Sequence, residues 1–229
     1  MTIGLVDRLP HGYTNATSRR DLEDGRPVVV KGYLGPDAVE RCGREAEALR
    51  FLAGRLPVPA LLAVEDSQLW LGFVPGVPGQ EALEREPVAV LLEIGRTARV
   101  LHTIDPSGLD LPGDRGAVLV HGDFGPQNMI FDLSTGAVAA VVDWEFVGFG
   151  EPVSDLAWCE WIVRTHHPRL TAALPHLYDG YGARPPWTER RVAMLAKCEW
   201  ALDFSRRWGS EAAIELWRRR IATTAAFAP

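Results

Sequence analysis

His121-Gly-Asp-Phe-Gly-Pro-Gln-Asn128 and Val141-Val-Asp-Trp-Glu145 are the two stretches of this sequence that decide the fold. The first lies between apolar runs at residues 117–121 and 129–132, and the second closes a further run at residues 138–143. Short apolar runs separated by turn residues predict three strands. Polar and charged side chains are therefore expected to gather at the ends of neighbouring strands.

These polar residues suit the transfer of a phosphoryl group from a nucleotide. Such a site needs a carboxylate beside the acceptor hydroxyl, oxygen ligands for Mg²⁺ and a fixed cation on the phosphates. Asp123 can supply the carboxylate, while Asn128 and Asp143 can supply hard oxygen ligands. Lys31, which ends an apolar run, can supply the cation, and Glu45 on the following helix is its expected partner. We therefore predict Asp123 as the catalytic residue and Asn128 and Asp143 as metal ligands.

The first part of the chain predicts a small, mostly β lobe. The predicted elements are a strand pair at residues 16–20 and 27–33, a helix from Asp37 to Gly54, and a hairpin at residues 60–64 and 69–74. The strand pair flanks the turn signal Asp24-Gly25, and Asp37 is a typical residue for the N-cap of the helix. The order of these elements is strand, helix, strand.

A stretch rich in proline and glycine, Pro75-Gly-Val-Pro-Gly79, is the expected flexible joint to the rest of the chain. Beyond it, apolar periodicity predicts helices at residues 87–104, 153–165, 169–182, 188–207 and 210–224. The expected fold class is α+β, with two lobes. A small β-rich N-terminal lobe covers residues 1–75, and a larger α-rich C-terminal lobe covers residues 76–229.

The composition of the chain excludes several classes of function. Of its 229 residues, 47% are apolar and 24% are charged, as in ordinary folded domains and unlike low-complexity chains. A net charge of −6 without a basic stripe argues against a nucleic-acid partner. The longest apolar runs have about six residues, whereas a membrane-spanning helix needs about 20. We therefore expect no membrane association.

Two rare residue types add to these expectations. The three cysteines include no Cys-x-x-Cys pair, and Asp7 and Arg8 interrupt the region where a signal peptide would be apolar, so a cytoplasmic protein is expected. Only two of the 24 basic residues are lysines, Lys31 and Lys197. Arginine does not replace a compact ammonium on phosphates, which favours a functional role for Lys31. The pattern predicts no role for Lys197.

The sequence resembles the aminoglycoside phosphotransferase and choline kinase family, a branch of the protein-kinase-like fold. The resemblance rests on the segments His121-Gly-Asp123 with Asn128, Asp143-Trp-Glu145, Gly150-Glu-Pro-Val-Ser-Asp155-Leu-Ala157, and Arg44 to Leu52 followed by Leu56-Pro-Val-Pro59. His11-Gly-Tyr-Thr-Asn15 resembles the nucleotide-positioning loop of the family, with a single glycine. The resemblance implies a two-lobed fold and an ATP-dependent kinase that uses Mg²⁺, with GTP as the alternative nucleotide.

The resemblance also implies where the nucleotide binds. The hinge that receives the adenine falls at residues 69–74, with backbone groups of Gly72 and Val74 facing the base. Leu71 is then the gatekeeper, and Val29 lies against the ring. His121 and Asp155 are expected to support the catalytic loop rather than to act as acid or base.

The acceptor is expected under Asp123, between the helix at 87–104, the segment after Asp143 and the C-terminal helices. The candidate contacts to the acceptor are Glu160, Glu199, Trp200 and Asp203. Gly122 stands where protein kinases have arginine, Trp144-Glu145 replaces Phe-Gly, and no Ala-Pro-Glu segment follows. These departures favour a small-molecule acceptor over a protein.

Three functions remain open from the sequence. They are a kinase for an aminoglycoside-like acceptor, a kinase for a small metabolite such as an amino alcohol or sugar, and a nucleotide-binding regulatory protein that has lost catalysis. The charges point both ways, because residues 151–229 carry a surplus of basic residues while residues 76–150 are strongly acidic. The sequence leaves the oligomeric state open.

Overall fold

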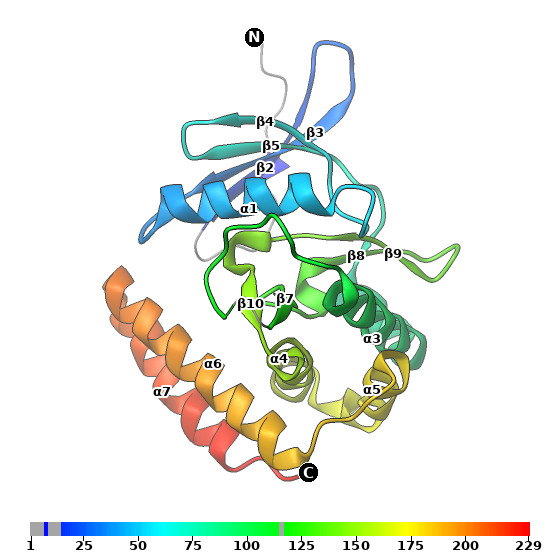
Figure 1. The fold of residues 1–229 in the computed structure, drawn as a ribbon, viewed down its shortest axis with the longest axis vertical. Helices are drawn as coiled ribbons and strands as arrows, with labels where there is room; N and C mark the ends of the chain where they lie inside the picture. Colours follow the sequence, from blue (N-terminus) through cyan, green and yellow to red (C-terminus); the bar gives the residue numbers. More distant parts are fainter. Residues whose placement is uncertain (1–6, 9–14, 115–116) are drawn as a thin grey trace.

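A five-stranded antiparallel sheet forms one end of the molecule (Figure 1). The computed structural model describes residues 7–8, 15–114 and 117–229. The strands of this sheet are β1 (Asp7–Arg8), β2 (Asn15–Asp21), β3 (Pro27–Tyr33), β4 (Leu61–Glu65) and β5 (Gln68–Gly72), in the order β1-β2-β3-β5-β4. The predicted strand pair and hairpin are confirmed. The sheet pairs Lys31 on β3 with Leu69 on β5.

Helix α1 (Ala38–Leu52) packs against the sheet on the side that faces the rest of the molecule (Figure 1). Its buried face includes Glu45, Ala46 and Leu49. Asp37 occupies the N-cap position as predicted, but its side chain makes no capping hydrogen bond. It pairs instead with Arg207 at 2.5 Å, and thereby ties the start of α1 to a C-terminal helix.

The prediction of a flexible joint is wrong for residues 77–79, because these residues are paired in a sheet or closely packed. Strand β6 (Val77–Pro78) pairs with β8 (Met129–Asp132). Helix α2 (Gly79–Arg85), which the sequence did not predict, begins directly after β6. A Cβ on Gly79 would lie 2.4 Å from the carbonyl oxygen of Pro126. Glycine is therefore needed here for close packing rather than for flexibility.

Two small sheets carry the stretches that decide the fold. One pairs β7 (Val118–Val120) with β10 (Gly148–Gly150), and the other orders β6, β8 (Met129–Asp132) and β9 (Ala137–Val141). Short 3₁₀ helices follow at Pro126–Asn128 and Trp144–Phe146. The three predicted strands are confirmed, whereas β10 was missed because Gly148-Phe-Gly150 has no apolar alternation.

The remaining helices are α3 (Pro87–Thr103), α4 (Pro152–His166), α5 (Pro175–Tyr181), α6 (Trp187–Trp208) and α7 (Glu211–Ala225). The helix expected at 169–182 is divided into a 3₁₀ segment, Pro168–Ala173, and α5, because Pro175 fits only the first turn of a new helix. Helices α3 and α5 touch through glycine, since a Cβ on Gly95 would lie 2.0 Å from the carbonyl oxygen of Leu177.

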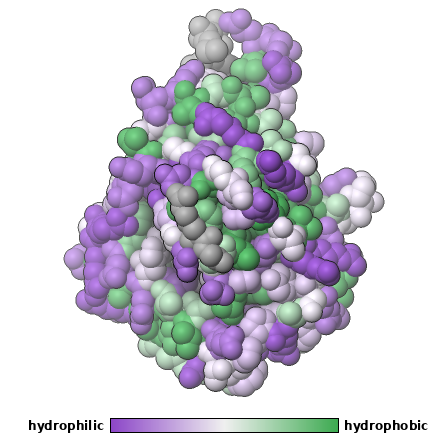
Figure 2. Space-filling model, in the orientation of Figure 1, coloured by the Kyte–Doolittle hydropathy of each residue, from purple (hydrophilic) through white to green (hydrophobic). Residues whose placement is uncertain are grey.

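A main core runs through both the sheet and the helical part of the molecule. A second cluster, which includes Trp158, Trp161 and Met194, joins α4 to α6. Hydrophilic residues cover the edge formed by α6 and α7, while hydrophobic residues show near the centre of the same face (Figure 2). Within the described residues, none of the helices combines the length and apolar character that crossing a membrane requires. The α+β, two-lobed fold class is confirmed.

Candidate active site

Lys31 stands between two carboxylates from distant parts of the chain. Its Nζ lies 2.5 Å from Oε2 of Glu45 on α1 and 2.5 Å from Oδ1 of Asp143, which follows β9. The hydroxyl of Tyr33 donates to the same oxygen of Glu45. Burial works to lower the pKa of Lys31, but the charges of Asp143 and Glu45 outweigh it and raise that pKa above its usual value. The ammonium therefore stays charged and fixed.

A second buried ion pair fixes the segment that carries Asp143. Arg41 on α1 lies 2.5 Å from Glu145, and Asn15 donates to the same carboxylate at 3.1 Å. Burial raises the pKa of Glu145 to about 7, and the neighbouring Asp143 acts in the same direction. The sequence analysis missed this pair, although Glu145 lies in the motif. Of the expected nucleotide-positioning loop, residues 11–14 lie outside the described residues.

The loop that carries Asp123 is held by the buried carboxylate of Asp155. This carboxylate accepts hydrogen bonds from the backbone N–H groups of His121 (2.8 Å) and Gly122 (3.0 Å), and from Nε2 of His102 (3.3 Å). Gly122 has φ +81°, and a Cβ there would lie 2.2 Å from the carbonyl oxygen of Phe146. Only glycine fits this position, which explains why no arginine precedes Asp123.

His121 connects this loop to the strand that leads to Asp143. Its Nδ1 accepts from the backbone N–H of Asp123 at 3.2 Å, so its Nε2 carries the proton and donates to the carbonyl of Val142 at 2.9 Å. The side chain is fully buried. Both ring nitrogens are thus engaged in positioning Asp123 and the end of β9.

Asp155→Asn should lower the free energy of unfolding by about 2 kcal/mol, because its amide group would oppose one of the buried N–H donors. Urea denaturation measures this loss. Asp179→Asn, an exposed exchange with the same change of charge, is the matched control. An unchanged unfolding free energy in Asp155→Asn would contradict the bracing role.

The same carboxylate sets a dependence of stability on pH. Burial works to raise the pKa of Asp155, but the hydrogen bond from His102 and the contacts to His121 hold it below its usual value. Its contribution is therefore present above the pKa of the unfolded state, about 3.9, and is lost as pH falls below it. We expect wild-type stability to fall more steeply than that of Asp155→Asn in acid, measured by urea denaturation at several pH values.

Asp123 is held at both carboxylate oxygens. Trp158 Nε1 donates to Oδ1 at 2.6 Å, and Asn128 Nδ2 donates to Oδ2 at 2.8 Å. Burial raises the pKa of Asp123, the nearby ammonium of Lys197 opposes this shift, and Asp143 adds to it. The geometry fixes a carboxylate whose proton affinity is higher than that of an exposed aspartate.

Asn128 and Asp143 fit a magnesium ion by the chemistry of their oxygens. Because Nδ2 of Asn128 donates to both the carbonyl and the carboxylate of Asp123, its amide oxygen is directed elsewhere. Asp143 has φ +68°, and its side chain keeps 32% of its surface exposed. Its second oxygen has no hydrogen-bond partner among the described residues. Mg²⁺ typically takes one or two such protein ligands and completes its shell with water and phosphate.

The expected hinge lies at the end of β5. Leu71 is buried and pairs with Val29 across the sheet, so the two lie side by side. The N–H of Gly72 donates to the carbonyl of Ala60 at 2.8 Å, which leaves only the carbonyl of Gly72 as a candidate for contact with a base. Val74 follows the end of the strand and is half-buried.

The four acceptor candidates have different surroundings. Glu160 is fully buried, and its carboxylate binds Arg164, Arg190 and Tyr178. The expectation that Glu160 contacts an acceptor is therefore corrected, since an internal ion-pair network occupies it. Glu199 and Asp203 are exposed and do not line the cavity described next, and Asp203 pairs with Arg206.

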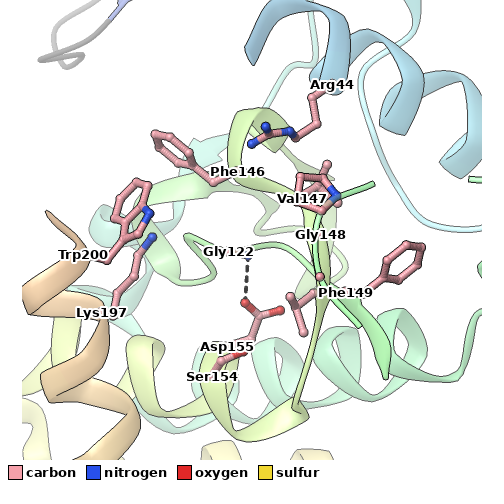
Figure 3. A pocket seen from close by; sticks show the side chains of 13 residues that line it. Arg44, Gly122, Phe146, Val147, Gly148, Phe149, Ser154, Asp155, Lys197 and Trp200 are labelled. Carbon is pink, nitrogen blue, oxygen red and sulfur yellow. Dashed lines mark hydrogen bonds between the residues drawn. The ribbon is translucent and has the colours of Figure 1, made fainter. Parts of the chain in front are cut away.

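A cavity of about 340 Å³ opens beside the loop that carries Asp123. Gly122, Phe146, Asp155 and Trp200 line it, together with Lys197 from α6 (Figure 3). Of the predicted acceptor residues, Trp200 alone is in this lining. Sequence reasoning assigned no role to Lys197, and its rarity in an arginine-rich chain was the available signal.

The two lobes and the residues around Asp123 define a protein of the kinase-like fold. The model of the phosphotransferase enzyme family matches residues 6–117 and 109–195. The chain belongs to this family, which confirms the resemblance found in the sequence.

Two proteins with different names are similar to this chain in sequence. It is 44% identical over 207 residues to acyl-CoA dehydrogenase family member 10 of Mus musculus, covering 65% of this chain and 19% of that protein. It is 28% identical over 140 residues to viomycin phosphotransferase of Streptomyces vinaceus, covering 58% of this chain and 45% of that protein. The chain thus spans less than half the length of either relative.

The fold is also that of a solved aminoglycoside phosphotransferase. A thermostable variant of APH(4)-Ia, in a ternary complex with AMP-PNP and hygromycin B, superposes with a TM-score of 0.67 at 19% identity. The match covers 99% of this chain and 96% of that one. At this level of identity the likeness is one of fold.

Proposed function

We propose that this protein transfers the γ-phosphoryl group of ATP to a hydroxyl group of a small molecule, with Mg²⁺ as the metal. The observation that carries the proposal is a pair of side-chain groups, Lys31 with Glu45 and Asp143, and Asp123 with Asn128. The backbone N–H of Val142, next to Asp143, donates to the carbonyl of Asn128 at 2.9 Å and links the two groups. Together the two groups supply the fixed cation, the oxygen ligands and the carboxylate that phosphoryl transfer requires. The complex of APH(4)-Ia with AMP-PNP supports a nucleotide in this fold.

The residues of the two groups have separate tasks in this reaction. Lys31, held by Glu45, binds phosphate oxygens, and Asn128 and Asp143 hold the metal ion, which neutralises phosphate charge when bound. Asp123 orients the acceptor hydroxyl and accepts its proton. The hydroxyl oxygen forms a bond to the γ-phosphorus while the bond from that phosphorus to the β–γ bridging oxygen breaks. The products are a phosphate ester and ADP.

The choice of acceptor rests on two different observations. The viomycin phosphotransferase relative and the hygromycin B complex favour an aminoglycoside-like or other antibiotic acceptor. The basic side chains Lys197 and Arg44 in the cavity favour a small metabolite over a polycation. The second candidate is therefore a metabolite kinase.

Acceptor-dependent release of ADP tests the proposal. Purified protein is incubated with Mg²⁺, ATP or GTP, and a panel of aminoglycosides, other hydroxylated antibiotics, amino alcohols, sugars and hydroxy acids. We expect at least one class to raise ADP release and to gain one phosphoryl group by mass spectrometry, and EDTA to stop both. If the protein binds nucleotide but no acceptor raises ADP release, the inactive regulatory alternative replaces the proposal.

A further inference from the structure

Lys197 is a cation in an aromatic setting beside the proposed catalytic carboxylate. Its Nζ lies 3.7 Å from the ring centre of Trp200, 5.2 Å from that of Phe146 and 5.8 Å from that of Trp158. Nε1 of the Trp158 indole donates to Asp123 at 2.6 Å. The ammonium of Lys197 therefore lies over the face of the same indole ring whose Nε1 holds the carboxylate proposed to receive the acceptor hydroxyl.

No carboxylate in the described parts of the chain lies within ion-pair distance of Lys197. The charges of Asp123, Asp155 and Glu145 act on it only from further away, and burial, the largest influence, lowers its pKa. Desolvation of an ammonium without an ion-pair partner costs free energy. A side chain held in this way is suited to a negative group that arrives with a ligand.

Arg44 adds a second cation to the same cavity from α1. Its guanidinium donates to the backbone carbonyl of Glu145 at 3.3 Å, and no ion pair to a described carboxylate is formed. Figure 3 shows Arg44 and Lys197 on different sides of the space in front of Gly122. The cavity thus presents positive charge from two helices.

The acidic side chain in the lining of the cavity already has hydrogen-bond partners within the protein. Asp155 is the acidic residue among those described as lining it, and both of its oxygens accept hydrogen bonds from the loop and from His102. In this lining a polycationic acceptor would therefore meet two cations and no carboxylate with free hydrogen-bonding capacity. An anionic acceptor would meet complementary charge.

We propose that the acceptor carries an anionic group, a carboxylate or a phosphate, in addition to its hydroxyl, and that Lys197 binds this group against the face of Trp200. This inference rests on the proposed function and specifies its substrate class. Arg44, which lines the same cavity, provides a second cation that a larger anionic acceptor can reach. The hydroxyl is then presented to Asp123, whose carboxylate Trp158 Nε1 holds.

Matched acceptors test this class. Hydroxy acids from glycolate to 6-hydroxyhexanoate, with gluconate and glycerol 3-phosphate, are compared with the corresponding amides, amines and uncharged polyols. We expect kcat/KM to favour the anionic member of a pair by about 10- to 100-fold, as charged hydrogen bonds typically do. The acid and phosphate arms show which anion is preferred.

Variants of Lys197 separate recognition from structure. Lys197→Met should remove the preference for the anionic member, Lys197→Glu should reverse it toward amines, and Lys197→Arg should retain part of it. Arg206→Met is the matched control and should retain the full preference. Arg206 is exposed and lies nine residues after Lys197, on the opposite face of α6. A purely structural lysine would lower kcat/KM for all acceptors alike, which would overturn the inference.

Binding is measured separately by tryptophan fluorescence, since Trp200 and Trp158 flank the ammonium. If the acids change the fluorescence of wild type but not of Lys197→Met, while no acceptor releases ADP, the anion site stands and the proposed function fails. If amines or polyols are phosphorylated with the same kcat/KM as the matching acids, the proposed function stands and the anion site fails. If none of the acids or phosphates binds or reacts, the anion site is overturned.

Discussion

Asp123→Asn should reduce kcat by about 10²- to 10⁴-fold and leave the nucleotide dissociation constant close to that of wild type. The amide has the shape of the carboxylate but cannot accept a proton from the acceptor hydroxyl. Trp158 still has an oxygen to donate to, so the loop keeps this side-chain contact. Acceptor-dependent ADP release measures kcat, and titration calorimetry measures nucleotide affinity.

The control for this exchange is Asp179→Asn, which removes one exposed negative charge that pairs with His176. It should keep wild-type turnover. The unfolding free energy of Asp123→Asn, from urea denaturation, should fall by about 1 kcal/mol, because the new amide meets the Asn128 donor. Turnover within threefold of wild type would show that Asp123 is not the catalytic residue, whatever the nucleotide affinity.

Much of the candidate site could be predicted because its residues follow short apolar strands. The motif around Asp123 fixes Asn128 five residues later, and the apolar run before Asp143 places that residue at a strand end. Lys31 and Glu45 are also close in sequence, on a strand and the helix that follows. Local pattern is therefore sufficient to place these positions, and the match to the phosphotransferase family model agrees with the family that they indicate.

The acceptor side could not be predicted in the same way, because it depends on how distant helices pack. Lys197 reaches the cavity only because α6 packs against α4, and no pattern near Lys197 encodes that contact. Glu160 is a charged residue on α4, but its neighbours on that helix are apolar and Arg164 follows one turn later. Those two features indicate a buried ion pair rather than a contact with an acceptor.

Lys31→Met should abolish most turnover and also lower the free energy of unfolding by about 3 to 5 kcal/mol. The substitution leaves Glu45, which is 1% exposed, without its cation and removes the only basic group paired with Asp143 among the described residues. Loss of activity and loss of stability therefore arise together in this variant. Urea denaturation and ADP release measure the two effects.

The double variant Lys31→Met with Glu45→Gln separates these effects. Removing the buried charge of Glu45 should restore part of the unfolding free energy, because an amide can accept from the Tyr33 hydroxyl without a counter-ion. Turnover should stay lost, since nothing replaces the ammonium on the phosphates. If the double variant regained both stability and turnover, Lys31 would serve only to neutralise Glu45. If Lys31→Met alone were as stable as wild type, the buried pair would not stabilise the fold.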